Sequence, residues 1–167
     1  MVGAVRDRAM TGAQQEFVTH QDPVWRERAN FIINAELPDR GRPKRFEQLW
    51  ATQLADDRFE VCCIPFFVFD LALGDVVATS PRDGRKYMVD KVVQASGRYV
   101  FRVWFGQSFQ PRDEFTGELA ALGSLMEWSS RNLLAVDAAD EEHAQVVADF
   151  LMEREKAGHL VYETGRS

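Results

Sequence analysis

Two aspartates interrupt the most apolar stretch of the chain and are its first candidates for chemistry. Asp70 and Asp75 lie within Ile64–Val77, a segment rich in Phe, Leu and Val. A carboxylate pair in an apolar pocket could raise one pKa and act in acid–base chemistry. The structural alternative makes Asp75 a turn residue that accepts backbone N–H groups, and Asp70 a loop cap. Arg98 and Arg102, with Arg131 nearby in register, could form an anion site in such a pocket, or lie solvated on a sheet face.

Other residue types with catalytic potential form no recognisable constellation. None of His20, His143 and His159 lies near a cysteine or forms the i, i+4 pair of a helical metal site. Cys62 and Cys63 adjoin apolar residues, so we expect buried, unreactive thiols. The sequence contains no glycine-rich phosphate loop, nucleophile elbow or metal-ligand cluster. We therefore expect a non-enzymatic protein with no metal and no cofactor.

The charge balance and the cysteine content restrict the partner and the compartment. The 167 residues carry a formal net charge of −6 with a pI of about 5.1, whereas binding to nucleic acid or anionic membranes usually needs clustered Lys and Arg. No apolar run could span a bilayer, and residues 1–15 lack the apolar core of a secretory signal. Two adjacent cysteines provide no disulfide framework. We expect a cytoplasmic protein that does not bind membranes, and its charge argues against a nucleic-acid partner.

Acidic and aromatic residues suggest a protein-binding surface. We expect at least one of four bulky aromatics near predicted element edges to be exposed, namely Trp25, Trp104, Phe109 or Trp128. Aromatic anchors ringed by acids are typical of an interface core with a polar rim. The candidate partner-binding residues are Asp56, Asp57, Trp104, Trp128, Asp137, Asp140, Glu141 and Glu142.

The elements that must position these residues begin as a meander of short strands. Residues 64–77 are expected to run as strand end, compact apolar loop, turn at Gly74-Asp75 and new strand. Strands are expected at residues 29–37, 46–54, 59–64, 76–79, 87–93 and 99–105. Asp83-Gly84 is expected to form the tight turn between the fourth and the fifth of these strands. To cover its core, such a meander must curl into a small antiparallel β-barrel or a curled sheet.

The pattern changes to helical periodicity at Pro111. One helix is expected to end at Gly123, and a second to start at Asp137 or Asp140 and end at Gly158. An extended segment at 125–136 and a last strand at 160–163 complete this half. The order favours a ferredoxin-like split βαβ layer with two helices on one face of an antiparallel sheet.

The expected class is therefore α+β, with three parts. Residues 1–22 read as a flexible N-terminal arm, 23–98 as the β-meander or small barrel, and 99–167 as the ferredoxin-like half. Because at most a turn separates the two halves, we expect them to pack as one unit.

Short motifs between residues 45 and 165 carry a family resemblance. The pieces are Glu47-Gln48-Leu49-Trp50-Ala51, Ile64-Pro65-Phe66-Phe67, Gly74-Asp75-Val76-Val77, Ser96-Gly97, Arg102-Val103, Leu122-Gly123 and Gly158…Tyr162-Glu163. In order and spacing they resemble the bacterial domain-of-unknown-function family four-two-six-five. Arg98 departs from that family, in which a histidine commonly follows the Ser-Gly pair. The resemblance implies a bacterial origin and this α+β layout, and it implies no activity.

Three functional hypotheses follow. The first is a non-enzymatic bacterial immunity or antitoxin-type inhibitor that occludes a toxin, since complementary negative charge speeds and selects association with a basic toxin domain. An alternative is a small-ligand-binding protein or enzyme with a pocket between barrel and helices, lined by Asp70, Asp75, Arg98 and Arg102. A further alternative, a nucleic-acid or ribosome-associated accessory protein, rests on fold analogy alone.

Overall fold

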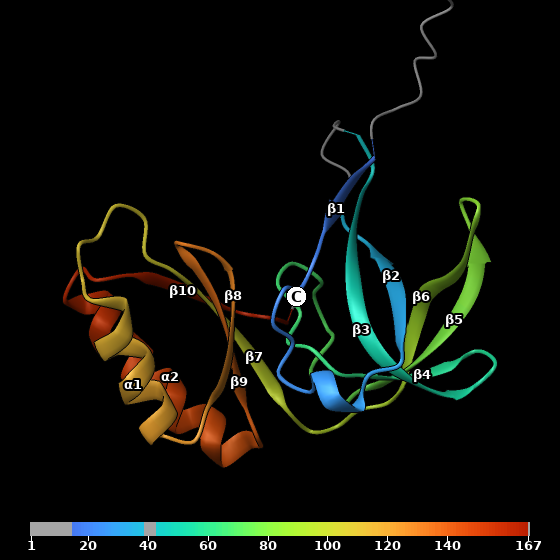
Figure 1. The fold of residues 1–167 in the computed structure, drawn as a ribbon. Coiled ribbons are helices and arrows are strands. Elements are labelled where there is room, and N and C mark those ends of the chain that lie inside the picture. The colour runs from blue at the N-terminus through green and yellow to red at the C-terminus, as the bar shows by residue number, and fades with distance from the viewer. Residues whose placement is uncertain (1–14, 39–42, 167) are drawn as a thin grey trace, which may run out of the picture.

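Strands of the first half close into a small barrel (Figure 1). The computed structural model describes residues 15–38 and 43–166. The barrel strands are β2 (Phe31–Glu36), β3 (Arg45–Ala55), β4 (Arg58–Val61), β5 (Val76–Arg82) and β6 (Arg85–Gln94). They follow the order β3-β2-β6-β5-β4, and β4 pairs back to β3. The predicted barrel is confirmed, although the β2–β6 pairing is parallel rather than antiparallel.

Alternating apolar residues direct one face of each barrel strand inward. Ile33 of β2 packs in the same buried core as Leu49 and Ala51 of β3. Between β5 and β6, Asp83 and Gly84 have φ angles of 53° and 74°, the positive values that a two-residue hairpin turn requires. The turn predicted from Asp-Gly is confirmed.

A second, antiparallel sheet carries both helices on one face (Figure 1). Its strands are β7 (Tyr99–Trp104), β8 (Leu125–Ser130), β9 (Leu133–Ala138) and β10 (Val161–Thr164), in the order β10-β7-β9-β8. Helix α1 (Arg112–Ala121) connects β7 to β8, and α2 (Glu141–Lys156) connects β9 to β10. The α+β class is confirmed. The extended segment expected at 125–136 is a hairpin of two strands.

Helix α2 settles the choice between the two predicted caps. The side chain of Asp140 accepts a hydrogen bond from the backbone N–H of His143 at 2.8 Å, which satisfies a free donor of the first turn. Asp137 instead lies within β9. Gly158, with a φ of 79°, follows the end of the helix as predicted.

The N-terminal segment differs from the expected flexible arm. Residues 1–14 lie outside the described part of the chain, but Glu16–Val18 form β1, which pairs in parallel with β3. His20, two residues further on, is only 3% exposed. A one-turn 3-10 helix, η1 (Arg26–Arg28), then leads into β2. The arm expected at 1–22 is therefore wrong for residues 16–20, which pack against the barrel.

The apolar segment 62–75 crosses from the barrel to the second sheet. Ile64, Phe66 and Leu73 share a buried cluster with Val100 of β7 and Ala135 of β9. These two strand residues lie on the face opposite the helices, so the segment separates the barrel from the sheet and does not contact a helical layer. This loop therefore fixes the position of the residues that lie between the barrel and the second sheet.

Candidate functional site at the junction of barrel and second sheet

A buried histidine lies between two buried glutamates where the two halves meet. His20 Nε2 is 2.8 Å from Glu47 Oε1 of β3, and His20 Nδ1 is 2.9 Å from Glu127 Oε1 of β8. Because carboxylates only accept hydrogen bonds, both ring nitrogens must donate, which requires the imidazolium form. We name His20, Glu47 and Glu127 the junction cluster. It joins the N-terminal segment, the barrel and the second sheet.

The electrostatics of the cluster agree with this geometry. Burial by itself would lower the pKa of His20, but contacts with Cys63, Glu127 and Glu47 outweigh it and raise that pKa to about 12. Burial would raise the pKa of Glu47, yet the His20 cation and the backbone donors of Phe66 and Phe67 lower it. His20 and Glu47 therefore keep their charges over the neutral range.

Glu47 also fixes the backbone of the central loop. Its two carboxylate oxygens accept N–H groups from Phe66 at 2.6 Å, Phe67 at 2.9 Å and Val68 at 3.0 Å. Glu127 accepts the N–H of Ile64 at 2.5 Å. Buried N–H groups without acceptors would be costly, so these carboxylates determine the conformation of the loop.

Beside this loop lies a cleft of about 530 Å³, which we name the junction cleft. It is lined by Leu37, Pro38, Pro43, Arg45, Phe67, Phe69, Arg102 and Glu163. One wall comes from the barrel, one from the second sheet, and the loop that Glu47 holds supplies two phenylalanine rings. The volume is in the range of small-molecule sites.

Arg102 is a buried cation with few partners. Its side chain is 4% exposed, it donates from Nη2 to the carbonyl of Val68, and it lies over the ring of Phe69 at 4.5 Å. Nη1 lies 3.5 Å from Glu163, whose side chain is 59% exposed. Within the described residues, Nε and Nη1 of Arg102 have no hydrogen-bond partner. Burial lowers the pKa of Arg102, which reflects the poor compensation of its charge.

The register of the second sheet explains why Arg102 faces the loop. Arg102 pairs with Ala135 on one side and Glu163 on the other, and Ala135 also pairs with Glu127. These residues form one row on the face away from the helices. Glu127 therefore reaches the junction cluster and Arg102 reaches the junction cleft from the same row.

A second arginine enters the cleft from the barrel. Arg45, at the start of β3, lies over the ring of Phe67 at 5.4 Å and is 3.4 Å from the exposed Glu16. Its Nε is also without a hydrogen-bond partner in the described part of the chain. Each wall of the cleft thus carries one arginine against one phenylalanine.

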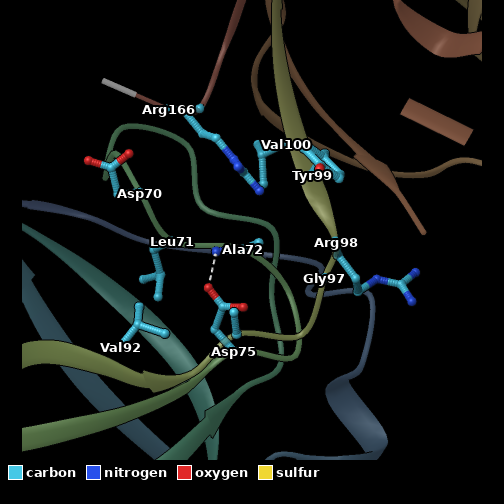
Figure 2. Close-up of a pocket in the computed structure, with 12 residues that line it drawn as sticks. Asp70, Leu71, Ala72, Asp75, Val92, Gly97, Arg98, Tyr99, Val100 and Arg166 are labelled. Carbon is cyan, nitrogen blue, oxygen red and sulfur yellow. Dashed lines mark hydrogen bonds between the residues drawn. The ribbon is translucent and has the colours of Figure 1, made fainter. Parts of the chain in front are cut away.

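The predicted pocket residues divide between two cavities. Asp70, Asp75 and Arg98 line a separate cavity of about 340 Å³ (Figure 2), whereas Arg102 lines the junction cleft. Figure 2 shows Asp70 and Asp75 at different places in the wall, with Arg166 reaching inward near Val100 and Arg98 pointing away. The two aspartates do not form the carboxylate pair of the catalytic hypothesis.

Asp75 and Arg98 make hydrogen bonds that hold the surrounding structure. Asp75 accepts the N–H of Ala72 at 2.9 Å and of Ser96 at 2.8 Å, which is the predicted turn role. Arg98 donates to Asp137 through Nε at 3.0 Å and Nη2 at 2.6 Å. Asp70 has a φ of 58° and its backbone N–H donates to the carbonyl of Gly165 at 2.7 Å. The charged groups of Asp75 and Arg98 in the 340 Å³ cavity are therefore already bonded to other parts of the protein.

The predicted partner-binding residues do not gather on one surface. Asp137 is 1% exposed and paired with Arg98, so it is not part of an acidic face. Asp56 and Asp57 are exposed at the β3–β4 turn of the barrel, whereas Asp140, Glu141 and Glu142 are exposed at the start of α2. The acids divide between the two halves.

The aromatic candidates are exposed, as expected for at least one of them, but they diverge. Trp104 is 47% and Trp128 39% exposed. Trp104 pairs with Leu133 and Trp128 with Leu134, consecutive residues of β9 whose side chains point to opposite faces. Trp128 lies on the helix side near Phe105, and Trp104 on the side of the junction cleft.

In the described part of the chain, neither the cysteines nor a cluster of metal-ligating side chains forms a further candidate site. Cys62 and Cys63 are buried and free, as predicted, and burial raises the pKa of both thiols. Among residues 15–38 and 43–166, no group of His, Cys, Asp and Glu side chains is arranged to hold a metal ion. No helix in those residues has the length and apolarity needed to cross a bilayer.

Comparison with known proteins places the chain in a family. The model of the domain of unknown function DUF4265 matches residues 47–162. The chain belongs to this family. The match begins at Glu47 and includes Glu127 and Arg102, whereas His20 and Arg45 precede it.

One solved structure resembles the fold. It is a hypothetical protein from Neisseria gonorrhoeae with a TM-score of 0.69 and 22% identity, covering 81% of this chain and 93% of that one. At this identity the likeness concerns the fold alone. No curated protein matches the chain.

Proposed function

We propose that this protein is a non-enzymatic binding protein whose binding site is the junction cleft, and that its ligand carries a negative charge. The observation that carries the proposal is the buried Arg102 with two nitrogen atoms that lack hydrogen-bond partners. A desolvated cation is expensive unless it is paired and hydrogen-bonded. An anion in the cleft beside Arg102 would compensate this charge.

The composition of the cleft supports binding over catalysis. Its described ionisable residues are Arg45, Arg102 and Glu163, and none is a histidine or a thiol. Arginine stays protonated and is a poor acid or base. Glu163 is exposed and already lies beside Arg102. These three residues therefore include no nucleophile with a neighbouring base to activate it.

An unbiased ligand search tests the proposal. The protein is dialysed to equilibrium against a deproteinised bacterial extract, and compounds enriched on the protein side are identified by mass spectrometry. We expect an anion enriched by the wild type and by Arg98→Met, not enriched by Arg102→Met, and recovered with unchanged mass. Arg98 is the matched control because it is bonded to Asp137 and lines the other cavity. Equal enrichment by all three proteins, or none, would overturn the proposal.

A second candidate is the immunity or antitoxin-type inhibitor of a basic toxin domain. The exposed acids Asp56, Asp57, Glu141 and Glu142 favour it, since opposite charges steer association. It ranks below the cleft because its acids belong to different halves and Asp137 is buried. We also propose that the second half is a ferredoxin-like layer, which the strand order β10-β7-β9-β8 supports.

A further inference from the structure

The geometry points to a specific ligand class for the junction cleft: a small organic carboxylate attached to a flat apolar group. This inference rests on the proposed function and specifies its ligand. It is carried by the juxtaposition of two arginines with two phenylalanine rings in one cleft of about 530 Å³.

The charges of the cleft select an anion. Two arginines and one glutamate line it within the described residues, and the glutamate is its most solvated ionisable side chain. The whole chain, by contrast, has a formal net charge of −6. A locally positive cleft in an acidic protein concentrates an anion there and repels cations. Guanidinium groups favour carboxylates and phosphates because their N–H groups match two acceptor oxygens.

The apolar lining distinguishes a carboxylate with an apolar body from a free inorganic anion. Phe67 and Phe69 supply apolar surface, with Pro38 and Pro43 at the barrel end. Inorganic phosphate would leave this surface in water, whereas a flat apolar group could lie against the rings of Phe67 and Phe69. Phe69 is 40% exposed in the free protein, so covering it would contribute to binding.

The size of the cleft fits a small molecule rather than a folded partner. Its volume lies within the usual range of about 300–1,000 Å³ for ligand sites, whereas stable protein interfaces bury about 800 Å² on each partner.

Four probes separate the contributions of charge and apolar surface by isothermal titration calorimetry. The probes are 2-naphthoate, its neutral analogue 2-naphthalenemethanol, acetate, and inorganic phosphate. We expect 2-naphthoate to bind at least about tenfold more tightly than each of the other three, because only it uses both the arginines and the rings. If 2-naphthalenemethanol binds as tightly as 2-naphthoate, the carboxylate is not part of what the cleft recognises. If phosphate binds more tightly than 2-naphthoate, the apolar group is not part of it.

Variants locate the site. Arg102→Met should weaken 2-naphthoate binding about tenfold to a hundredfold, and Arg102→Lys should restore only part of it, because lysine keeps the charge and loses the planar fork. Phe69→Ala should weaken 2-naphthoate and leave the weak binding of acetate unchanged. Arg98→Met should bind like the wild type.

The outcomes distinguish this inference from the proposed function. If no naphthoate binds while the dialysis experiment yields an Arg102-dependent anion, the ligand class is wrong and the cleft stands as a binding site. If naphthoate binds equally to Arg102→Met and wild type, its site lies elsewhere and the inference is overturned. A failure of both experiments would overturn both proposals.

Discussion

His20 and Glu47 connect the junction cluster to the junction cleft. His20 Nε2 lies 2.8 Å from Glu47 Oε1, and the same carboxylate accepts the N–H of Val68, whose carbonyl accepts a hydrogen bond from Arg102. A buried cation is thus linked, through one carboxylate and the backbone of one residue, Val68, to the buried cation of the cleft. The order of the cleft wall should depend on Glu47.

The first prediction separates Glu47 from Glu127. Removing one partner of a buried ion pair usually costs about 3–5 kcal/mol. We expect Glu47→Gln and Glu127→Gln each to lower the free energy of unfolding in urea melts. Only Glu47 holds the N–H groups of Phe66, Phe67 and Val68, so only its substitution should also weaken ligand binding in the cleft. Equal losses of affinity in the two variants would contradict a positioning role for Glu47.

The second prediction concerns pH. The pKa of His20 is raised from 6.5 to about 12, so the folded protein keeps a proton that the unfolded chain releases between those values. Stability from this proton is complete below about pH 6.5 and is lost as pH rises, with a slope approaching about 1.4 kcal/mol per pH unit. The lowered pKa of Glu47 acts in the opposite direction, so its contribution is lost as pH falls below 4.5.

The control for the pH prediction is His20→Gln. Urea melts between about pH 7 and 8.5 should show the alkaline loss in the wild type and a much flatter profile in the variant. Cys62 and Cys63, whose thiol pKa values burial raises, add a loss of stability in the same direction near the top of this window. The variant keeps both thiols, so the difference between the two profiles reports His20. Parallel profiles would mean that His20 is neutral in the folded protein.

The third prediction concerns the thiols and the core ring beside them. Cys62 and Cys63 are buried with raised pKa values, so both should react slowly with a thiol reagent in the folded protein and rapidly in urea. Phe66 is buried and stacks on His20 at 4.0 Å, so Phe66→Ala should cost about 3–5 kcal/mol and speed the labelling. Rapid native labelling of the wild type would show that this core opens easily.

The fourth prediction tests the inhibitor hypothesis on any basic toxin domain recovered as a partner. Charge reversal at Asp56 and Asp57, or at Glu141 and Glu142, should lower the on-rate with little effect on folding, because these acids are exposed. The on-rate should also fall steeply with salt, since screening acts over about 8 Å at physiological ionic strength. Trp104→Ala should instead raise the off-rate. On-rates that change with neither salt concentration nor charge reversal would contradict this hypothesis.

The fold was predictable to the extent that local patterns determined it. Strand alternation located the barrel strands, and the Asp-Gly pair located the β5–β6 turn, because both depend on neighbouring residues. The parallel pairing of β1 with β3 was missed, since it joins segments far apart in the sequence and β1 spans only Glu16–Val18. Asp137 was misplaced because its partner Arg98 lies 39 residues away.

The site was only partly predictable. Arg102 was identified as an anion-site candidate. Its neighbours in the cleft were not, because Phe69 belongs to the crossing loop and Arg45 to β3 of the barrel, both distant in sequence. His20 gave no signal in a segment without periodicity. Glu47 did give one: it stands two residues before the inward Leu49, so strand alternation places its carboxylate on the core side. A charged residue that strand alternation places on the buried face indicates a buried partner for its charge.

The central claim is that Arg102 is held in the cleft for a ligand rather than for stability. Urea melts of wild type and Arg102→Met, each with and without 2-naphthoate, test it most directly. Without ligand, Arg102→Met should be at least as stable as the wild type, because an apolar side chain replaces a poorly paired buried cation. Adding 2-naphthoate should raise the midpoint of the wild type and leave that of Arg102→Met unchanged. A strongly destabilised Arg102→Met that still gains the full stabilisation from 2-naphthoate would contradict the account.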